Sequence, residues 1–260
     1  GIAALEDSLR LADDVHTRLD LAGAFAAVER YPSALPHLRK AVQIAPRDPV
    51  AWAALAETLV KVEKPEGAVD SLRESQKVCP RCTGNEGWNR VANDVAHASV
   101  AKAEKQIASG DVPGARKSVD GALVLRPKLP EVQLVVGKVA RAEGDTTAAT
   151  SAFRNAVEQT PDAAVDPGAG ARLELATLLS GYGKGVEAVT LAEQVGAARG
   201  DDGAALDTLG RACDATRNTD CARKAYGRLV KLPAPDGKSK GALDHARLRM
   251  KALKVRGKKR

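Results

Sequence analysis

The sequence contains few aromatic residues and no long apolar run, and each shortage narrows the possible structures. Aromatic residues make up 3% of the 260 residues, whereas Ala, Leu and Val dominate a hydrophobic fraction of 44%. The alternation of β-branched and aromatic residues that is typical of strands is scarce. No apolar run of about 18 residues occurs, so the sequence indicates no transmembrane helix. Alanine has the highest helix propensity and lets helix axes approach, so this composition favours closely packed helices.

Motifs that carry chemistry are also missing. The chain has no His-Glu-x-x-His, no Gly-x-Ser-x-Gly and no phosphate-binding Gly-x₄-Gly-Lys-Ser/Thr. The glycine-rich run 181–185 lacks a Ser or Thr after Lys184, so we interpret it as a turn between helices. Acid pairs such as Asp13–Asp14 and Asp201–Asp202 are expected to cap helix starts. The sequence therefore predicts no enzyme, no cofactor and no metal.

Positive charge is concentrated at one end of the chain. The net charge is +7, but residues 238–260 carry +9 and the remaining residues sum to −2. The rest of the chain is therefore nearly neutral, which argues against nucleic-acid binding along its length. The basic tail, residues 251–260, has two interpretations: contact with an anionic lipid or nucleic-acid surface, or a disordered solubilising end. Because no aromatic residues interleave the basic ones, we favour the second.

A pattern recurs at a 34-residue interval. Pro46 and Pro80 are 34 residues apart, and small or apolar residues precede each at matching positions. Before Pro46 these are Leu21, Ala22, Phe25, Ala34, Leu38 and Ala41, and before Pro80 they are Leu55, Ala56, Leu59, Ala68, Leu72 and Ser75. Four later units repeat it around Ala115 and Pro127, Gly137 and Phe153, Ala176 and Ala188, and Gly210 and Tyr226. Small residues at this spacing are expected where paired helices cross, and proline is expected to end the second helix.

The pattern resembles the tetratricopeptide repeat (TPR), a 34-residue helix-turn-helix with Trp-x₂-Leu-Gly-x₂-Tyr, Ala-x₃-Phe and a closing Pro. The resemblance implies an all-α, right-handed superhelical solenoid of about six units with a C-terminal capping helix, built around Leu243, Ala246, Met250 and Leu253. Residues 1–14 are expected to form a partial repeat or cap helix, and residues 237–260 the capping helix and basic tail. The predicted units are residues 15–48, 49–82, 83–129, 130–163, 169–202 and 203–236.

The third unit departs from the family's spacing by about three helical turns. Val100, Ala103 and Ile107 continue the helical spacing that begins at Trp88. We therefore predict one extended first helix over residues 86–108. It would serve as an arm that contacts a partner, or it would be a local packing variation, with a break near Asn93–Asp94 as the other possibility.

The four cysteines form two pairs that are close in sequence. Cys213 and Cys221 flank a short turn between two predicted helices, where Cα atoms can approach to the ~5.5 Å that a disulfide needs. Cys79 and Cys82 form a C-x-x-C without the βαβ setting of a redox site, and only His97 lies near as a further zinc ligand. We favour two disulfides over buried thiols or zinc.

The resemblance also implies a binding site, because first helices of TPR units line a concave groove that holds an extended or helical segment of a partner. The Lys and Asn clamp for chaperone tails is not matched, since Gly23, Ala26, Ala53 and Val60 occupy groove positions. Lys138 with Arg141 is the best candidate for an acidic partner group, and Leu134 with Leu173 for an apolar floor. By register, the groove residues are His16, Leu19, Glu57, Lys61, Glu104, Glu131, Leu134, Lys138, Arg141, Leu173, Asp207, Arg211 and Asp214.

These observations predict a protein-interaction scaffold whose partner is a protein or peptide of unknown identity. Paired cysteines favour an oxidising compartment, so we expect the periplasm or cell envelope, with the cytoplasm as the alternative. The sequence begins at Gly1 without Met, so we expect a longer natural N-terminus, which would carry any membrane anchor. The alternative function is binding to an anionic surface, membrane or nucleic acid, through the basic tail.

Overall fold

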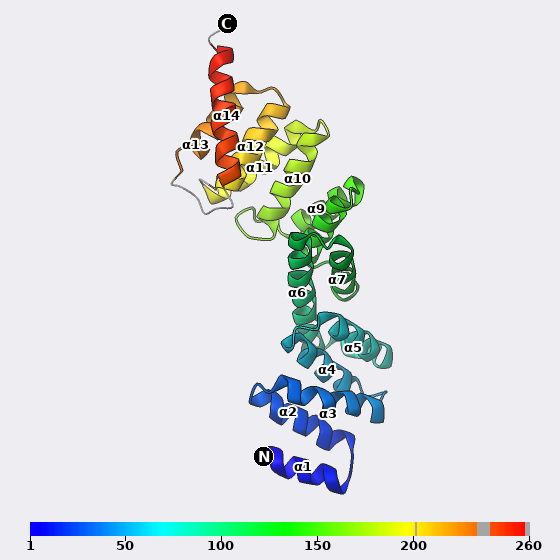
Figure 1. Cartoon of the computed structure of the whole chain (residues 1–260). Helices are drawn as coiled ribbons and strands as arrows, with labels where there is room; N and C mark the ends of the chain where they lie inside the picture. The colour runs from blue at the N-terminus through cyan, green and yellow to red at the C-terminus, as the bar shows by residue number, and fades with distance from the viewer. Residues whose placement is uncertain (201, 233–239, 258–260) are drawn as a thin grey trace. The chain divides into compact units, whose positions relative to one another are not determined.

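The described part of the chain is entirely helical (Figure 1). The computed structural model describes residues 1–200, 202–232 and 240–257, the last four by backbone alone. Within these ranges there is no strand, which confirms the predicted all-α class. None of the described helices combines the length and apolar character that crossing a membrane requires. The helices are α1 Ile2–Leu11, α2 Val15–Ala27, α3 Tyr31–Ile44, α4 Pro49–Lys61, α5 Pro65–Val78, η1 Pro80–Gly84, α6 Glu86–Ser109, α7 Val112–Leu125, α8 Pro130–Ala142, α9 Thr146–Gln159, α10 Gly168–Gly181, α11 Gly185–Arg199, α12 Gly203–Ala215, α13 Thr219–Leu229 and α14 Lys240–Gly257.

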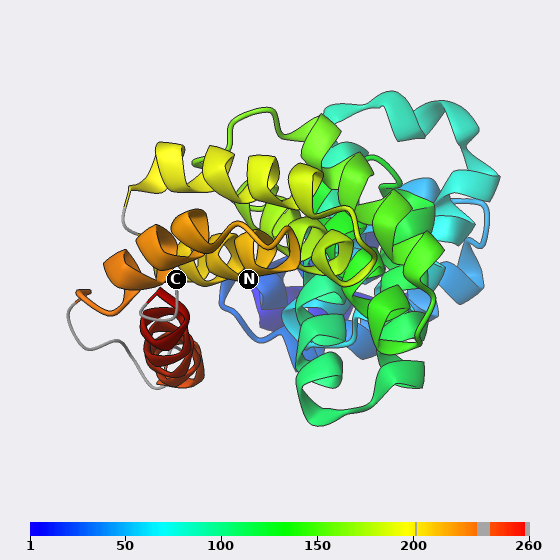
Figure 2. The same cartoon turned by 90° about the horizontal axis from the view of Figure 1, so that it is seen from above.

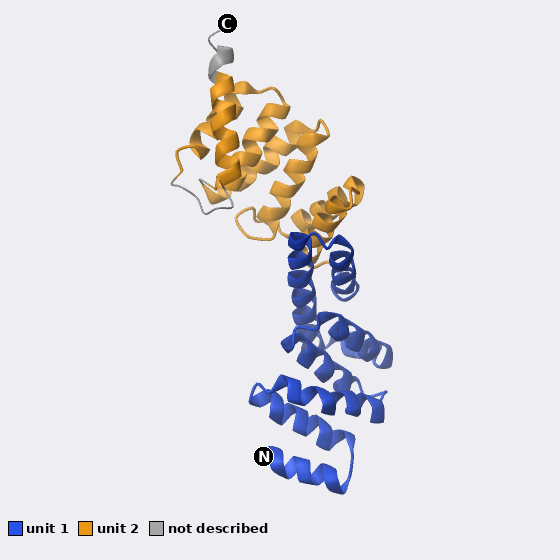
Figure 3. Ribbon diagram, viewed as in Figure 1, with its two compact units in different colours: residues 1–127 blue, residues 128–260 orange. Residues whose placement is uncertain are grey.

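The chain divides into two compact units, residues 1–127 and 128–260 (Figure 3). In unit 1, α2 pairs with α3, α4 with α5 and α6 with α7. In unit 2, α8 pairs with α9, α10 with α11 and α12 with α13. Each predicted repeat holds one such pair, although α10 begins one residue before the predicted range 169–202. The helix-turn-helix pair is therefore the building block of both units.

Large side chains on the second helix of a pair pack against small residues on the first helix. A Cβ atom added at Gly137 would lie 2.4 Å from the Phe153 ring, and one added at Gly210 would lie 2.3 Å from the Tyr226 ring. Both rings are fully buried. Protein interiors are closely packed. The missing side chains of Gly137 and Gly210 therefore leave the room that the rings of Phe153 and Tyr226 occupy.

Aspartate and asparagine begin many of the helices. The Asp14 carboxylate accepts a hydrogen bond from the Thr17 backbone N–H at 3.0 Å, and the Asp202 carboxylate accepts one from Ala205 N–H at 2.9 Å. Hydrogen bonds from Thr17 lower the pKa of Asp14, because they favour its charged form. The predicted capping role is confirmed for these two residues. Asp13 instead pairs with Arg18, and Asp201 lies outside the described residues.

The extended helix predicted in the third unit is confirmed, since α6 continues unbroken past Asn93 to Ser109. Its 24 residues compare with 13 in α2, α4, α8 and α12. Arg126, at the end of α7, donates hydrogen bonds from Nη2 to the Asn89 carbonyl at 2.9 Å and side chain at 2.8 Å. The second helix of this pair therefore returns along most of the length of α6.

The C-terminal helix covers the end of unit 2, as the capping prediction required. Leu243, Ala246 and Leu253 are buried. Ala246 and Leu253 join the core cluster of Tyr226 and Leu229, and Met250 packs against it. Figures 1 and 2 show α14 beside α12 and α13 in both views. This helix removes from solvent the apolar edge that a terminal repeat would otherwise expose.

Both cysteine pairs are brought together. Cys79 at the end of α5 pairs with Cys82 in η1, with Cα atoms 5.3 Å apart. Cys213 on α12 pairs with Cys221 on α13, with Cα atoms 5.7 Å apart. These separations lie within the range for disulfides. Each pair fastens a junction between two successive elements.

Candidate partner-binding groove

The residues predicted to face the groove all lie on the first helices of pairs. In unit 1 they are His16 and Leu19 on α2, Glu57 and Lys61 on α4, and Glu104 on α6. In unit 2 they are Glu131, Leu134, Lys138 and Arg141 on α8, Leu173 on α10, and Asp207, Arg211 and Asp214 on α12. Since each unit is a separate body, each face is described by itself.

A trough runs between α2 and α4 in unit 1. Its volume is about 430 Å³. Leu19, Gly23 and Ala26 line it from α2, and Glu57 and Lys61 from α4. The structure thus brings together three of the predicted groove residues, Leu19, Glu57 and Lys61. Small residues on α2 leave the space in which a side chain of a partner would fit.

A second trough, of about 300 Å³, lies between α4 and α6. Val50, Ala54 and Glu57 line both troughs, so the two adjoin along α4. Trp88 and Arg90 line the second trough from α6. We call the two together the unit 1 groove. The remaining predicted residues of this unit, His16 and Glu104, line neither trough.

One ion pair lies where the two troughs meet. Arg90 Nη1 donates a hydrogen bond to Glu57 Oε1 at 2.9 Å, and the same atom is 3.7 Å from Asp94. The hydrogen bond to Glu57 raises the pKa of Arg90. Lys61 is exposed and has no ion pair with a described residue. Its ammonium group is therefore a free positive charge at this edge of the unit 1 groove, and Asp20 on α2 lines the same trough with a negative charge.

Trp88 gives the second trough a rigid apolar wall. Its side chain is 6% exposed, and the Arg126 guanidinium lies 5.3 Å from the ring centroid. Burial lowers the pKa of Arg126. The indole Nε1 is buried without a hydrogen-bond partner among the described residues. The Trp88 ring is thus held in place by burial and by the Arg126 guanidinium, and it forms a rigid part of the trough wall.

In unit 2 the charged groove candidates are engaged within the chain. Arg141 forms a two-pronged ion pair with Glu174 of α10. Arg141 therefore already has a carboxylate partner within the chain, and its predicted contact with an acidic partner group stays a prediction. Lys138 also interacts within the chain.

The apolar and acidic candidates at the start of this unit are largely enclosed. Leu134 is 9% exposed and packs in the core cluster of Leu175 and Phe153. Leu173 is half-buried against Val195. One carboxylate oxygen of Glu131 is buried without a hydrogen-bond partner among the described residues. Leu134 and Leu173 thus contribute mainly to the interior instead of an open floor.

The acids of α12 are tied to α14. Arg249 donates hydrogen bonds to both carboxylate oxygens of Asp214, at 2.8 and 2.7 Å, and the Tyr226 hydroxyl donates to Asp214 at 3.1 Å. Burial and the Asp214 charge raise the pKa of Tyr226 far above its usual value. Asp207 accepts a hydrogen bond from Arg211 at 2.8 Å and lies 3.4 Å from His245. These side chains hold the capping helix in place.

Sequence reasoning missed the partners in these ion pairs. Glu57 and Arg90 are 33 residues apart, as are Arg141 and Glu174. A separation of about one repeat between opposite charges on first helices would have indicated both pairs. Residues 258–260 of the basic tail lie outside the described residues, and residues 254–257 are described by backbone alone. Among the described residues, no cluster of three or more His, Cys, Asp or Glu side chains has the geometry of a metal site.

Comparison with known proteins agrees with this architecture. A family model described as the tetratricopeptide repeat matches residues 15–58, which contain α2, α3 and most of α4. No curated protein sequence matches the chain. Among solved structures, the chain is similar to YrrB, described as a TPR protein with an unusual peptide-binding site. The TM-score is 0.56 and the identity 14%, covering 81% of this chain and 97% of YrrB.

Two larger proteins share the fold. A chain of the APC/C hetero-tetramer Cut9–Hcn1 matches with TM-score 0.51 and 13% identity, covering 94% of this chain and 45% of that one. Yeast Tom70 matches with TM-score 0.51 and 15% identity, covering 97% of this chain and 49% of Tom70. The chain therefore spans about half the length of these two proteins. The 34-residue pattern, the stacked helix pairs and the similar structures together show a tetratricopeptide-repeat fold, and the family model identifies one such repeat at residues 15–58.

Proposed function

We propose that this chain is a non-catalytic protein-interaction scaffold that holds a segment of a partner protein in the unit 1 groove. The observation that carries the proposal is the pair of adjoining troughs along α4, which share Val50, Ala54 and Glu57. Concave sites with apolar walls and few polar groups are typical of ligand recognition. A segment lying along α4 would contact α2 on one side and α6 on the other.

The lining residues define the segment that fits. Leu19, Gly23, Ala26 and Ala54 offer small and apolar surface. Lys61 offers one positive charge that no described residue neutralises. The segment that suits this surface carries apolar side chains for the two troughs and one acidic group for Lys61. The Glu57–Arg90 pair fixes the polar edge between them.

The similar structures support binding of a peptide or protein. YrrB is described by a peptide-binding site, and the Cut9–Hcn1 chain comes from a protein assembly. Both share only the fold with this chain, so they support the class of function and leave the partner open. The role in assembling a cell-envelope complex is part of the same proposal.

The envelope location rests on the cysteine pairs. Disulfides persist in oxidising compartments and are rare in the cytosol. We expect no free thiol in the protein after unfolding without reductant, when thiols are counted with a chromogenic reagent. Four reactive thiols, the number of cysteines in the sequence, would remove the argument for an oxidising compartment.

The groove itself is tested with peptides selected from a random display library on the purified chain. Gly23→Trp fills the first trough from a position where an added Cβ atom meets nothing within 4 Å, and Ala54→Arg obstructs both troughs. Each should weaken the selected peptides by about tenfold or more, measured by fluorescence anisotropy. Gln43→Trp, at an exposed position of α3, is the matched control and should leave affinity unchanged.

Two results would contradict this function. If the selected peptides bind both groove variants as tightly as the wild type, they bind outside the groove. Removal of residues 254–260 should not affect capture, and a loss of capture would instead favour the alternative function, binding to anionic surfaces through the basic tail.

A further inference from the structure

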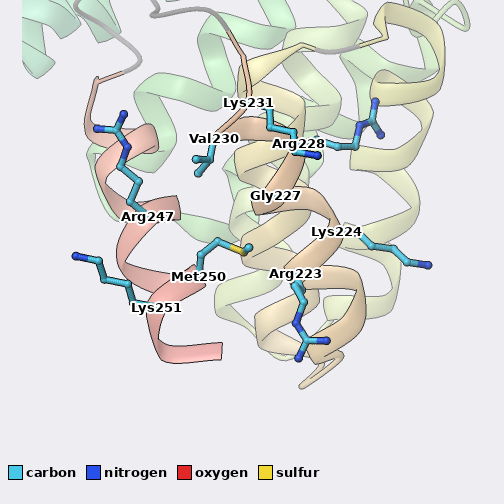
Figure 4. A pocket seen from close by; sticks show the side chains of 9 residues that line it. All are labelled: Arg223, Lys224, Gly227, Arg228, Val230, Lys231, Arg247, Met250 and Lys251. Carbon is cyan, nitrogen blue, oxygen red and sulfur yellow. The ribbon is translucent and has the colours of Figure 1, made fainter. Parts of the chain in front are cut away.

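A separate pocket of about 810 Å³ lies between α13 and α14 in unit 2 (Figure 4). Its floor is apolar and consists of Gly227, Val230 and Met250. Figure 4 shows Met250 reaching from α14 toward α13, with the charged side chains directed outward around it. The pocket has no role in the proposed groove function, because none of its residues lines the unit 1 groove.

Every charged residue that lines this pocket is basic. The cations are Arg223, Lys224, Arg228 and Lys231 from α13, and Arg247 and Lys251 from α14. Arg223 pairs with Asp220 at 3.1 Å, and Arg247 lies 3.7 Å from Asp244. Lys224, Lys231 and Lys251 form no ion pair with any residue in the described ranges. The rim therefore has positive charge available for an anionic occupant.

The equivalent face of α5 shows what kind of occupant fits. Ala68 of α5 and Ala222 of α13 hold the same place in their helix pairs, and both are fully buried. Counted from these alanines, Val69 corresponds to Arg223, Asp70 to Lys224 and Arg73 to Gly227. In unit 1 this face of α5 receives the next second helix, α7, because Val69 lies against Gly121.

The neighbouring helix also matches. In unit 1, α6 packs on α4 and α5, and α7 then packs on α5 and α6. In unit 2, α14 packs on α12 and α13 in the manner of α6. The α13–α14 pocket thus lies where the next second helix would pack. Its apolar floor suits the apolar side of a helix better than a solvated phosphate group.

We propose that the α13–α14 pocket docks an acidic amphipathic helix of a partner protein, which takes the place of a following second helix. The apolar side of that helix packs on Met250, Val230 and Gly227. Its carboxylates lie near Lys224, Lys231 and Lys251, where complementary charge fixes orientation and speeds association. The chain then has two binding surfaces: the unit 1 groove for a segment, and this pocket for a helix.

The test uses a fluorescein-labelled synthetic peptide of about 16 residues, long enough to form a helix, with Leu on one face and Glu on the others. Binding to the whole chain is measured by anisotropy. The Glu peptide should bind about tenfold or more tightly than a version with Lys in place of Glu. A version with Gln in place of Leu should be weakened similarly, because it lacks the apolar face.

Variants of the chain separate docking from general attraction between opposite charges. Gly227→Leu fills the floor but leaves every charge in place, and should weaken the Glu peptide about tenfold. Gly227→Ala is its control, because the added methyl group would lie 3.8 Å from Met250 Cε, in ordinary contact. K224E/K231E/K251E should abolish binding. K105E/K128E/K184E changes the net charge equally at exposed positions elsewhere and should preserve it.

Three outcomes would overturn the proposal. Equal binding by the wild type and Gly227→Leu would show that the pocket is not used. If the two triple variants lose affinity for the Glu peptide equally, the binding depends only on the net charge of the chain. If the Glu peptide fails to bind while vesicles of phosphatidylglycerol and phosphatidylcholine do so through Lys224, Lys231 and Lys251, the surface contacts lipid instead. Circular dichroism at 222 nm checks that every variant keeps its helices.

Discussion

The two units use the same spacing but fill their helix crossings differently. In unit 1 the small residue of each first helix is alanine, and the residue sixteen positions later is leucine or valine, as in Ala56 and Leu72. In unit 2, two of the three pairs combine glycine with an aromatic ring, Gly137 with Phe153 and Gly210 with Tyr226. The third pair of unit 2 has alanine at both positions, Ala176 and Ala192, so the repeat keeps the spacing of the crossing residues while their identities vary.

The two units also differ in the surface that their first helices present. In unit 1, small residues on α2 and α4 leave two adjoining troughs. In unit 2, Arg141 is paired with Glu174, and α14 engages Asp214 through Arg249. This side of the first helices thus leaves open troughs in unit 1, where we propose that a partner binds, whereas in unit 2 Arg141 and Asp214 are engaged within the chain. Each of the following experiments would break or sharpen that contrast.

The largest expected effect is at a glycine beneath a ring. Gly210→Ala places a Cβ 2.3 Å from Tyr226, so it should lower the free energy of unfolding by about 1–3 kcal/mol. Chemical denaturation followed by circular dichroism measures the change. Gly23→Ala, in unit 1, is the matched control, because its Cβ meets nothing within 4 Å. Improved helix propensity should make that variant slightly more stable, by up to about 1 kcal/mol. Equal effects of the two substitutions would contradict the packing argument.

The next effect concerns the attachment of α14 to unit 2. Arg249→Ala leaves the Asp214 carboxylate, which is 20% exposed, without its cation, and should cost about 1–2 kcal/mol. Urea unfolding gives the value, and faster protease cleavage within α14 should accompany it. Arg247→Ala, whose contact with Asp244 at 3.7 Å is exposed, should change stability by less than about 0.5 kcal/mol. Similar losses in both variants would show that α14 is not held by Asp214.

A smaller effect is expected from the ion pair at the unit 1 groove. A double-mutant cycle with Glu57→Gln and Arg90→Gln should give a coupling energy of about 0.2–1 kcal/mol, because both side chains are partly exposed. Since salt screens such pairs, the coupling should shrink as sodium chloride is added. A coupling that is unchanged at high salt would mean that the pair does not act electrostatically.

The smallest effect is a pH dependence in unit 1. His37 stacks on Phe25 with ring centroids 5.7 Å apart, and burial together with the Arg18 charge lowers the pKa of His37 below 6.5. The folded state then favours the neutral ring. The stabilisation is present above pH 6.5 and is lost as pH falls below that value toward the folded-state pKa.

Proton NMR titration of His37 and unfolding curves at several pH values measure this effect. His37→Gln should remove this part of the pH dependence. A His37 titration midpoint above 6.5 would contradict the assignment.

The fold was predictable because a few positions recur at a fixed interval. Ala56 and Ala68, or Gly210 and Ala222, are twelve residues apart in every pair, and each is buried. Helical periodicity also indicated that α6 continues past Asn93, since Val100, Ala103 and Ile107 continue the helical spacing. These features are local, and local spacing is what a sequence displays directly.

The binding surfaces were only partly predictable. Leu19, Glu57 and Lys61, which register predicts to face a groove, line one trough, and their role in binding stays a prediction. Register does not reveal which polar residue meets which, so Arg141 was assigned to a partner although Glu174 binds it. The α13–α14 pocket depends on how α14 lies against α13, which no spacing within either helix determines. Sequence therefore identifies the side of a helix that is exposed, whereas the structure is needed to identify the contacts across it.

The long helix α6 illustrates how such a chain can gain length. Ala92 and Ala103, both fully buried, are eleven residues apart, and eleven residues make about three turns of helix. Both alanines therefore point to nearly the same side of α6. The extra length leaves Ala103 facing α7, with which α6 pairs. An insertion of a whole number of helical turns leaves the following buried side chains pointing in the same direction. An insertion with an extra half turn would instead point them toward solvent. The extra length of α6 is therefore compatible with the helix pairing of its repeat because it amounts to about three complete turns.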